Sequence, residues 1–205
     1  MTTIIDYGMG NLDSIRNMGK KVGYEVAVSG DPAVITKAEK LILPGVGAFD
    51  KGMANLRERG LIPVLNERVL ERKIPILGVC LGVQLFTRGS EEGKLAGLGW
   101  IAGDTKRFRF GPENPRLKVP HMGWNFIEQA KPAALLEGLP PESRFYFVHS
   151  YHLVCDDPND VLTWTTYGLR FASAVQRDNI WGTQYHPEKS HKFGMAVLKN
   201  FLALR

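Results

Sequence analysis

An unbroken apolar segment that runs directly into a pair of glycines constrains most strongly how this chain can fold. The segment is Ile74-Pro75-Ile76-Leu77-Gly78-Val79, and Cys80-Leu81-Gly82 follows it. A run without polar alternation is typical of a strand buried on both faces of a parallel sheet. A helical pattern begins at Leu81 and extends to about Arg88. The sequence therefore predicts a sharp turn from a buried strand into a helix.

The first half of the chain repeats this alternation of strand and helix. The expected strands are Thr2–Ile5, Glu25–Val28 and Lys40–Leu43, and the expected helices are Leu12–Val22, Phe49–Arg59 and Leu61–Arg72. Elements alternating in this order form a parallel sheet covered by helices. We therefore expect an α/β fold with a central, mainly parallel sheet flanked by helices.

The second half changes in character and predicts added antiparallel strands. The expected strands are Trp100–Phe110, Pro120–Glu128, Phe145–Val154, Val161–Tyr167, Phe171–Gln176 and Ile180–Tyr185, with a hairpin turn at Arg177-Asp178-Asn179. Ser190 is a candidate N-cap for a last helix, in which apolar residues recur at helical spacing. These residues are Phe193, Val197, Phe201 and Leu204. Because no linker divides the chain, we expect a single domain over residues 1–205.

The composition excludes several classes of protein. With only 2 cysteines, Cys80 and Cys155, the chain has no disulfide framework and suits a reducing compartment. Its longest uncharged apolar stretch, Ile74–Phe86, is shorter than the ~20 residues of a membrane helix. Asp6 interrupts the N-terminal apolar run, which argues against a secretory signal. We expect a soluble cytoplasmic protein with no membrane partner.

The positive charge has no clear meaning in the sequence alone. Lys plus Arg is 26 and Asp plus Glu is 21, which gives a net charge of 26 − 21 = +5. Most bases alternate with acids, as solvated helix faces do, so we expect no nucleic-acid partner. In Lys106–Lys118, however, five bases stand against one acid. This segment is either a plain surface loop or a patch for an anionic ligand or partner.

Cys80 has the sequence context of a nucleophile. Gly78-Val79-Cys80-Leu81-Gly82 joins a strand to a helix, as in a nucleophile elbow with sulfur in place of oxygen. Small residues two before and two after the nucleophile permit the turn. The amides at the start of the helix would favour a thiolate over a thiol. The alternative is an inert core cysteine.

A nucleophilic cysteine needs a base and a group that orients it. Tyr185-His186-Pro187-Glu188 follows an expected strand, so His186 could be the base and Glu188 its orienting carboxylate. An oxyanion hole could come from Pro44-Gly45-Val46-Gly47, with Val46 and Gly47, and from the amide of Leu81. Taken singly, the first motif and the glycines of the second could be ordinary turns.

Together these motifs resemble the class I, triad-type glutamine amidotransferases. That family has a flavodoxin-like fold, a glycine-rich oxyanion loop, a G-x-C-x-G-x-Q elbow and a terminal H-P-E. The resemblance implies that Cys80, His186 and Glu188 hydrolyse glutamine to glutamate and ammonia. It also implies that Gln84, Ser150 and Tyr151 bind glutamine. We expect no metal or other cofactor, because His149 and His152 have the spacing of weak metal ligands but no cysteine or acid completes a set. Without the resemblance, Gln84 could be an exposed helical residue.

Further segments resemble those family members that supply ammonia to a separate (β/α)₈ synthase subunit in histidine biosynthesis. These segments are Asp6–Leu12, Pro44–Gly47, Pro120–Asn125, Tyr146–Tyr151 and Gln184–Ser190. The resemblance implies a heterodimer and places Asn11, His121, Trp124 and Lys189 at the contact with the partner. The basic segment Lys106–Lys118 could also dock on an acidic rim of that partner.

Rival interpretations differ in partner or in chemistry. Other members of the family serve anthranilate, aminodeoxychorismate, guanylate or pyridoxal phosphate synthesis. A flavodoxin-like binding module without covalent chemistry would leave Cys80 structural. A cysteine hydrolase acting on peptides would keep the triad but give no reason for Gln84, Ser150 and Tyr151.

Overall fold

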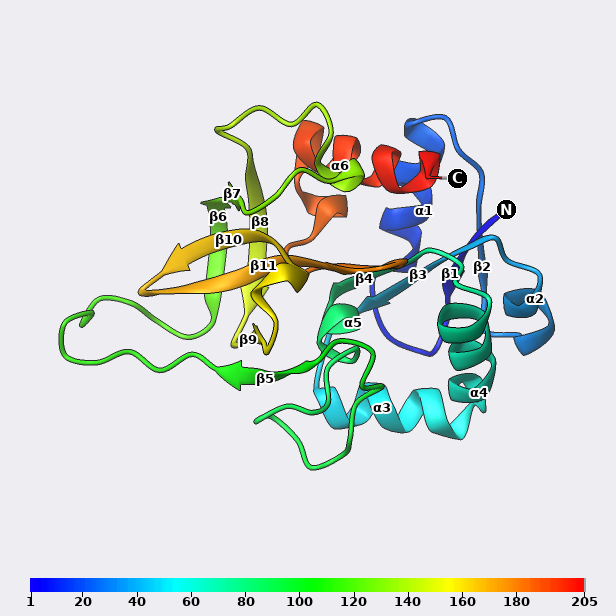
Figure 1. The fold of residues 1–205 in the computed structure, drawn as a ribbon, viewed down its shortest axis with the longest axis horizontal. Coiled ribbons are helices and arrows are strands. Elements are labelled where there is room, and N and C mark those ends of the chain that lie inside the picture. The colour runs from blue at the N-terminus through cyan, green and yellow to red at the C-terminus, as the bar shows by residue number, and fades with distance from the viewer. Residues whose placement is uncertain (205) are drawn as a thin grey trace.

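The computed structural model describes residues 1–204 and contains a ten-stranded sheet and a separate two-stranded sheet (Figure 1). The large sheet consists of β1 (Thr2–Ile5), β2 (Val26–Ser29), β3 (Lys40–Gly45), β4 (Ile76–Cys80), β5 (Gly103–Arg107), β7 (Glu128–Gln129), β9 (Tyr151–Cys155), β10 (Val161–Tyr167), β11 (Leu169–Arg177) and β12 (Ile180–Thr183). The small sheet pairs β6 (His121–Phe126) with β8 (Arg144–His149).

The large sheet has a parallel part and an antiparallel part. Strands β2, β1, β3, β4 and β12 lie side by side and are parallel. From β12 the sheet continues antiparallel through β11, β10 and β7, and β9 and β5 extend it from β11. The predicted α/β architecture is confirmed. The C-terminal strand β12 lies beside β4, which brings the end of the chain to the elbow.

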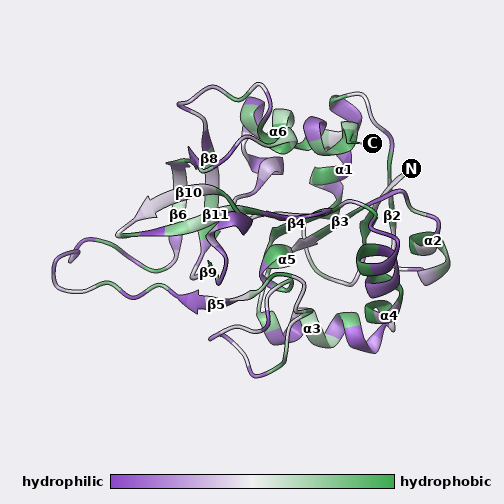
Figure 2. Cartoon of the chain, in the orientation of Figure 1, coloured by the Kyte–Doolittle hydropathy of each residue, from purple (hydrophilic) through white to green (hydrophobic). Residues whose placement is uncertain are grey.

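Helices cover both faces of the parallel part. They are α1 (Leu12–Lys21), α2 (Pro32–Thr36), α3 (Phe49–Glu58), α4 (Leu61–Asn66), α5 (Leu81–Gln84) and α6 (His191–Ala203). Helices α1 and α6 lie over one face, and α3, α4 and α5 lie over the other (Figure 1). Their colouring is mixed along their length, as expected for helices with one buried side (Figure 2). None of the helices in residues 1–204 is long and apolar enough to span a membrane.

Helix α5 is much shorter than the predicted helix that extends to about Arg88. It ends at Gln84, and the next three carbonyls bond to a different segment instead of continuing the helix. The carbonyl of Leu85 accepts from the amide of Leu98. In the same way, the carbonyl of Phe86 accepts from Ile101 and that of Thr87 from Gly99. The α2 helix, which the sequence did not predict, is capped by Asp31, whose carboxylate accepts from the amide of Ala33 at 2.8 Å.

Two further predictions needed correction. The expected strand Phe145–Val154 is broken at Ser150, where the chain leaves the small sheet as β8 and enters the large sheet as β9. Ser190 does precede α6, but its hydroxyl makes no capping bond. That hydroxyl instead donates to the carbonyl of His186 at 2.6 Å and accepts from the amide of Tyr146 at 3.0 Å. Ser190 therefore ties the segment after β12 to β8.

The fold leaves no room for a side chain at Gly82. A Cβ at Gly82 would lie 1.8 Å from the carbonyl oxygen of Leu43 in β3, whereas Gly89 has open space around it. We expect Gly82→Ala to lower the free energy of unfolding by about 2 kcal/mol, because overpacking costs up to ~3 kcal/mol and helix propensity returns only ~1 kcal/mol. Denaturant titration measures this change. Gly89→Ala is the matched control, and equal stability of the two variants would contradict the prediction.

Candidate active site

Cys80 lies at the turn between β4 and α5 in a strained backbone conformation. Its φ is 55° and its ψ is −110°, values that residues other than glycine rarely adopt. The flanking glycines make room for the turn: a Cβ at Gly78 would lie 2.6 Å from the ring of Phe86 and 2.7 Å from the backbone of Val83. Such backbone strain is typical of functional sites. The elbow predicted from the sequence is present.

His186 and Glu188 form a buried pair just beyond β12. The Nδ1 of His186 donates to Oε1 of Glu188 at 2.7 Å, and the two side chains are only 1% and 2% exposed. The Nε2 of His186 has no hydrogen-bond partner within residues 1–204. This is the arrangement of a general base, in which one ring nitrogen is held and the other is available to a substrate.

The predicted residues meet in one pocket at the carboxyl ends of β3 and β4. The pocket has a volume of about 250 Å³. It is lined by Val46, Gly47, Cys80, Leu81, Gln84, Glu92, Pro120, Val148, His149, Ser150, Tyr151 and His186. Of the nine residues proposed for catalysis, the oxyanion hole and glutamine binding, only Glu188 does not line it, because Glu188 lies behind His186. Ligands of α/β proteins commonly bind at this edge of the sheet.

The environment of His186 favours a charged imidazole. Burial lowers the pKa of His186, but Cys80 and Glu188 outweigh burial and raise the pKa to about 10. Burial, together with nearby Asp160, Asp156 and Asp157, raises the pKa of the Cys155 thiol to about 12. Cys155 is therefore a neutral thiol at pH 7, and a protonated His186 is available beside Cys80.

Gln184 is a site residue that the sequence analysis did not single out. Its Nε2 donates to the sulfur of Cys80 at 3.8 Å, and its Oε1 accepts from Nε2 of Gln84 at 3.0 Å. Gln84, which is buried, also donates to the carbonyl of Tyr151 at 3.1 Å. Its signal in the sequence was its place at the start of the resembling segment Gln184–Ser190, next to the Tyr185-His186-Pro187-Glu188 motif.

Glu92 is a second residue that was not predicted, and it is the only acidic one among the pocket-lining residues. Its Oε2 accepts from the amide of Phe49 at 2.8 Å, at the start of α3. Glu92 lies in the irregular segment after α5, so no periodicity pointed to it. A carboxylate in this place can attract the ammonium group of an amino-acid substrate.

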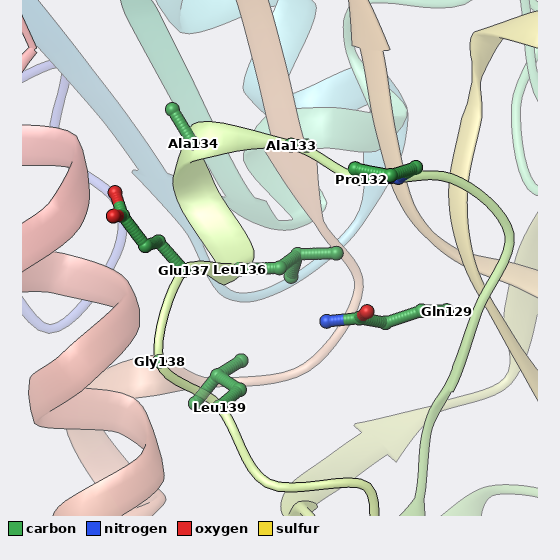
Figure 3. Close-up of a pocket in the computed structure, with 8 residues that line it drawn as sticks. All are labelled: Gln129, Pro132, Ala133, Ala134, Leu136, Glu137, Gly138 and Leu139. Atoms are coloured by element: carbon green, nitrogen blue, oxygen red, sulfur yellow. The ribbon is translucent and has the colours of Figure 1, made fainter.

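A larger hollow elsewhere on the surface lacks this chemistry. It has a volume of about 530 Å³ and is lined by Gln129, residues 132–134 and residues 136–139, next to α6 (Figure 3). No cysteine, histidine, lysine or arginine lines it. Size alone therefore does not identify the active site; the pocket at Cys80 is the candidate because it holds a nucleophile and a base.

The residues predicted at a partner contact fall into two groups. Asn11 and Lys189 are exposed, and Trp124 is 42% exposed and stacks on His191 with ring centroids 5.4 Å apart. For His121 the predicted surface position is wrong. Its side chain is only 3% exposed, because it points inward from β6 and contacts His149. Its side chain does not lie on the surface.

The basic segment Lys106–Lys118 is partly neutralised within the chain. Glu91 accepts from Arg109 at 2.6 Å and lies 3.9 Å from the ammonium of Lys106. Arg107 donates to the hydroxyl of Tyr151 at 3.1 Å. Two of the five bases therefore pair with an acid, and a third holds a residue of the pocket.

Comparison with known proteins agrees with this geometry. The family model described as "Glutamine amidotransferase class-I" matches residues 3–204. The chain belongs to this family, so the resemblance predicted from the elbow, the oxyanion loop and H-P-E is confirmed.

Its relatives within the family carry a more specific name. The "Imidazole glycerol phosphate synthase subunit HisH 2" of Methanococcus maripaludis is 52% identical over 98% of each chain. The protein of the same name from Pseudomonas aeruginosa is 52% identical over 100% of each chain. The HisH subunit of Moorella thermoacetica is 50% identical over 97% of this chain and 92% of its own.

Solved structures agree on the fold. The PurLQS structure from Thermotoga maritima has a TM-score of 0.72 at 17% identity and covers 98% of this chain and 96% of its own. A glutamine amidotransferase from the same organism has a TM-score of 0.67 at 14% identity and covers 98% of this chain and 95% of its own. At this identity the likeness concerns the fold alone.

The pair of His186 and Glu188 can be tested by titration. We expect Glu188→Gln to lower the pKa of His186 from about 10, because the carboxylate is one of the two groups that raise it. NMR chemical shifts of the imidazole followed against pH measure the change. Glu92→Gln, which removes a carboxylate from the same pocket but not from His186, is the control. An unchanged His186 pKa in Glu188→Gln would contradict this account.

Proposed function

We propose that this chain is the glutaminase subunit of an imidazole glycerol phosphate synthase and supplies ammonia for histidine biosynthesis. The observation that supports this most is that Cys80 and the His186–Glu188 pair line or adjoin one pocket at adjacent strand ends. The family and the HisH relatives at about half identity over full length support the pathway. A free thiol nucleophile suits the cytoplasm, whose reducing conditions preserve it.

The first half of the reaction forms a thioester. The Cys80 sulfur, as a thiolate, attacks the side-chain carbonyl carbon of glutamine, and the carbonyl oxygen becomes an oxyanion. Amides of Leu81 and of the Val46–Gly47 loop would stabilise that charge. His186 gives its proton to the leaving nitrogen, the carbon–nitrogen bond breaks, and ammonia leaves a glutamyl thioester on Cys80. Glu188 keeps the ring of His186 in the orientation that this transfer needs.

The second half releases glutamate. His186, now neutral, takes a proton from a water molecule, and the resulting hydroxide attacks the thioester carbonyl. The carbon–sulfur bond breaks and returns Cys80 as a thiolate beside His186, which keeps the proton it took from water. The product departs as glutamate after its carboxyl proton passes to the solvent. The cycle consumes one glutamine and one water and yields glutamate and ammonia.

The pocket offers groups for each end of glutamine. Gln84, Ser150 and Tyr151 line one wall and are the proposed glutamine-binding residues. Glu92 adds a negative charge that would attract the α-ammonium group. A volume of about 250 Å³ suits a substrate the size of an amino acid better than a peptide.

The proposed partner is a (β/α)₈ synthase subunit that forms a heterodimer with this chain. In this proposal the partner uses the ammonia to convert a ribotide into imidazole glycerol phosphate and an aminoimidazole carboxamide ribotide. One surface suits such a contact: the outer side of β6 exposes Met122 (62%), Trp124 (42%) and Phe126 (57%). Three exposed large hydrophobics on one strand are typical of an interaction surface.

The nitrogen-donor role predicts that loss of Cys80 affects the reaction with glutamine but not the reaction with ammonium. With the ribotide and the synthase subunit present, Cys80→Ala should reduce the glutamine-dependent reaction by at least ~10³-fold, because the nucleophile is lost. The same variant should retain the reaction with ammonium, which bypasses Cys80. Product formation is followed with each nitrogen source, and Cys155→Ala is the matched control. Loss of both activities in Cys80→Ala would argue against a pure nitrogen-donor role.

The proposed contact predicts weaker association when its aromatic centre is removed. We expect Trp124→Ala to raise the dissociation constant of the complex with the synthase subunit by ~30-fold or more, since buried aromatic anchors contribute at least ~2 kcal/mol and ~1.4 kcal/mol is tenfold. Leu70→Ala is the control, because Leu70 is also exposed (40%) but lies in the helical turn after α4, away from β6. Calorimetry measures both. Equal dissociation constants for Trp124→Ala and Leu70→Ala would show that β6 is not part of the interface.

A further inference from the structure

Two buried histidines outside the catalytic pair form a cross-strand link beside the pocket. His121 in β6 stands opposite His149 in β8, and the Nδ1 of His121 lies 3.0 Å from the Nε2 of His149. Both side chains are buried, and His149 lines the pocket at Cys80. The mechanism above uses neither of them.

Asn125 fixes which nitrogen of His121 carries the proton. The Nδ2 of Asn125 donates to the carbonyl of Thr166 at 3.0 Å, and its Oδ1 accepts from the amide of Phe126 at 2.8 Å. These two backbone partners determine the orientation of the amide group. The same Nδ2 therefore faces Nε2 of His121 at 3.3 Å as a donor, and Nε2 must accept.

The direction of every following bond is then determined. His121 carries its proton on Nδ1 and donates it to Nε2 of His149. His149 in turn carries its proton on Nδ1 and donates to the carbonyl of Tyr151 at 2.7 Å. A second proton on either ring would bring two donors face to face. Burial agrees with this, since it lowers the pKa of His121 to about 4 and that of His149 well below its usual value.

This chain of hydrogen bonds ends at the carbonyl of Tyr151, a residue that lines the pocket. The carbonyl of Tyr151 also accepts from Nε2 of Gln84 at 3.1 Å, so two side chains hold it from two elements. Ser150 and Tyr151 lie where the chain passes from the small sheet to the large one. At this crossing the side chains of Gln84 and His149 hold the backbone of Tyr151 in place.

We propose that His121 and His149, oriented by Asn125 as neutral imidazoles with the proton on Nδ1, are positioning residues that hold the Ser150–Tyr151 wall of the pocket in the conformation that binds glutamine. The inference rests on the proposed function for its substrate. It goes beyond that function in assigning roles, tautomers and a direction to residues that do not react.

The competing explanation is that both rings merely fill the aromatic core. His152 separates the two explanations, because it is a third buried histidine in the same core. The ring centroid of His152 lies 4.6 Å from that of Phe108, and the ring centroid of His149 lies 5.2 Å from that of Phe108. The one hydrogen bond of its side chain within residues 1–204 is a long contact of 3.4 Å with the carbonyl of Leu153. His152→Leu therefore removes a packed imidazole without touching the chain of hydrogen bonds.

The first experiment reads the tautomers directly. Nitrogen NMR of the ¹⁵N-histidine-labelled wild-type protein at pH 7 should show His121 and His149 neutral, both protonated on Nδ1, the less common tautomer in water. Signals are assigned by loss in His121→Gln and His149→Asn. An Nε2-protonated or charged ring at either position would overturn the proposal. Because this measurement needs no turnover, it stands apart from any failure of the proposed glutaminase activity.

The second experiment asks whether the link acts on glutamine binding. In the complex with the synthase subunit, His149→Leu should raise the KM for glutamine about tenfold, because it leaves the Tyr151 carbonyl with one donor fewer. His149→Asn, which keeps a donor in the position of Nδ1, should stay within about threefold of wild type. His152→Leu should not change the KM. Equal KM values for His149→Leu and His152→Leu would overturn the proposal.

If His149→Leu does not fold, the comparison of His149→Asn with His149→Asp takes its place. Both side chains have the same size, but aspartate at pH 7 can only accept a hydrogen bond. The proposal expects His149→Asp to raise the KM at least tenfold over His149→Asn, and equal values would overturn it. If the wild-type complex shows no glutaminase activity while the tautomers are as expected, the proposed function has failed and the hydrogen-bond chain has not.

Discussion

The close approach of α5 to β3 is the constraint on which the site depends. The position where Gly82 would carry a Cβ is 1.8 Å from the Leu43 carbonyl, so the helix after Cys80 lies directly against the neighbouring strand. Two residues before this contact, Cys80 has a positive φ of 55°, and Cys80 lines the pocket. Gly45 of β3 pairs with Cys80 of β4, and this strand register places the Val46–Gly47 loop beside the nucleophile. The packing of α5 on β3 and the pairing of β3 with β4 thus bring nucleophile and loop together.

The antiparallel half of the molecule supplies the other wall of the pocket. Strand β12 is parallel to β4 and delivers Gln184 and His186 to the elbow. The Ser190 hydroxyl then joins the His186 carbonyl to the Tyr146 amide in β8. As a result the base, β8 and the crossing at Ser150 form one connected unit. Hydrogen bonds therefore connect β8 both to His186 and to the proposed glutamine-binding residues, and β6 joins this unit through His121.

What the sequence could and could not predict follows from the range of the interactions involved. The elbow, the oxyanion loop and H-P-E were predictable because each is a local motif whose residue types suit one backbone geometry. The length of α5 was not, because the carbonyls of Leu85, Phe86 and Thr87 bond to residues 98–101, a tertiary pairing without periodicity. The break at Ser150 was missed because an apolar run does not show a change of sheet. Gln184, Glu92 and the buried position of His121 likewise depend on distant partners.

Three histidines around one pocket show how partners, rather than burial, decide protonation. His121, His149 and His186 are all buried, and burial lowers the pKa of each. Only His186 has a carboxylate and a cysteine beside it, and these raise its pKa to about 10. His149 faces a carbonyl and another imidazole, neither of which compensates a charge as a carboxylate does. The charged ring can therefore transfer protons, while the neutral rings have fixed donors and acceptors and can only hold geometry. One pocket thus keeps its acid–base group and its proposed positioning groups chemically distinct, although all three use the same side chain.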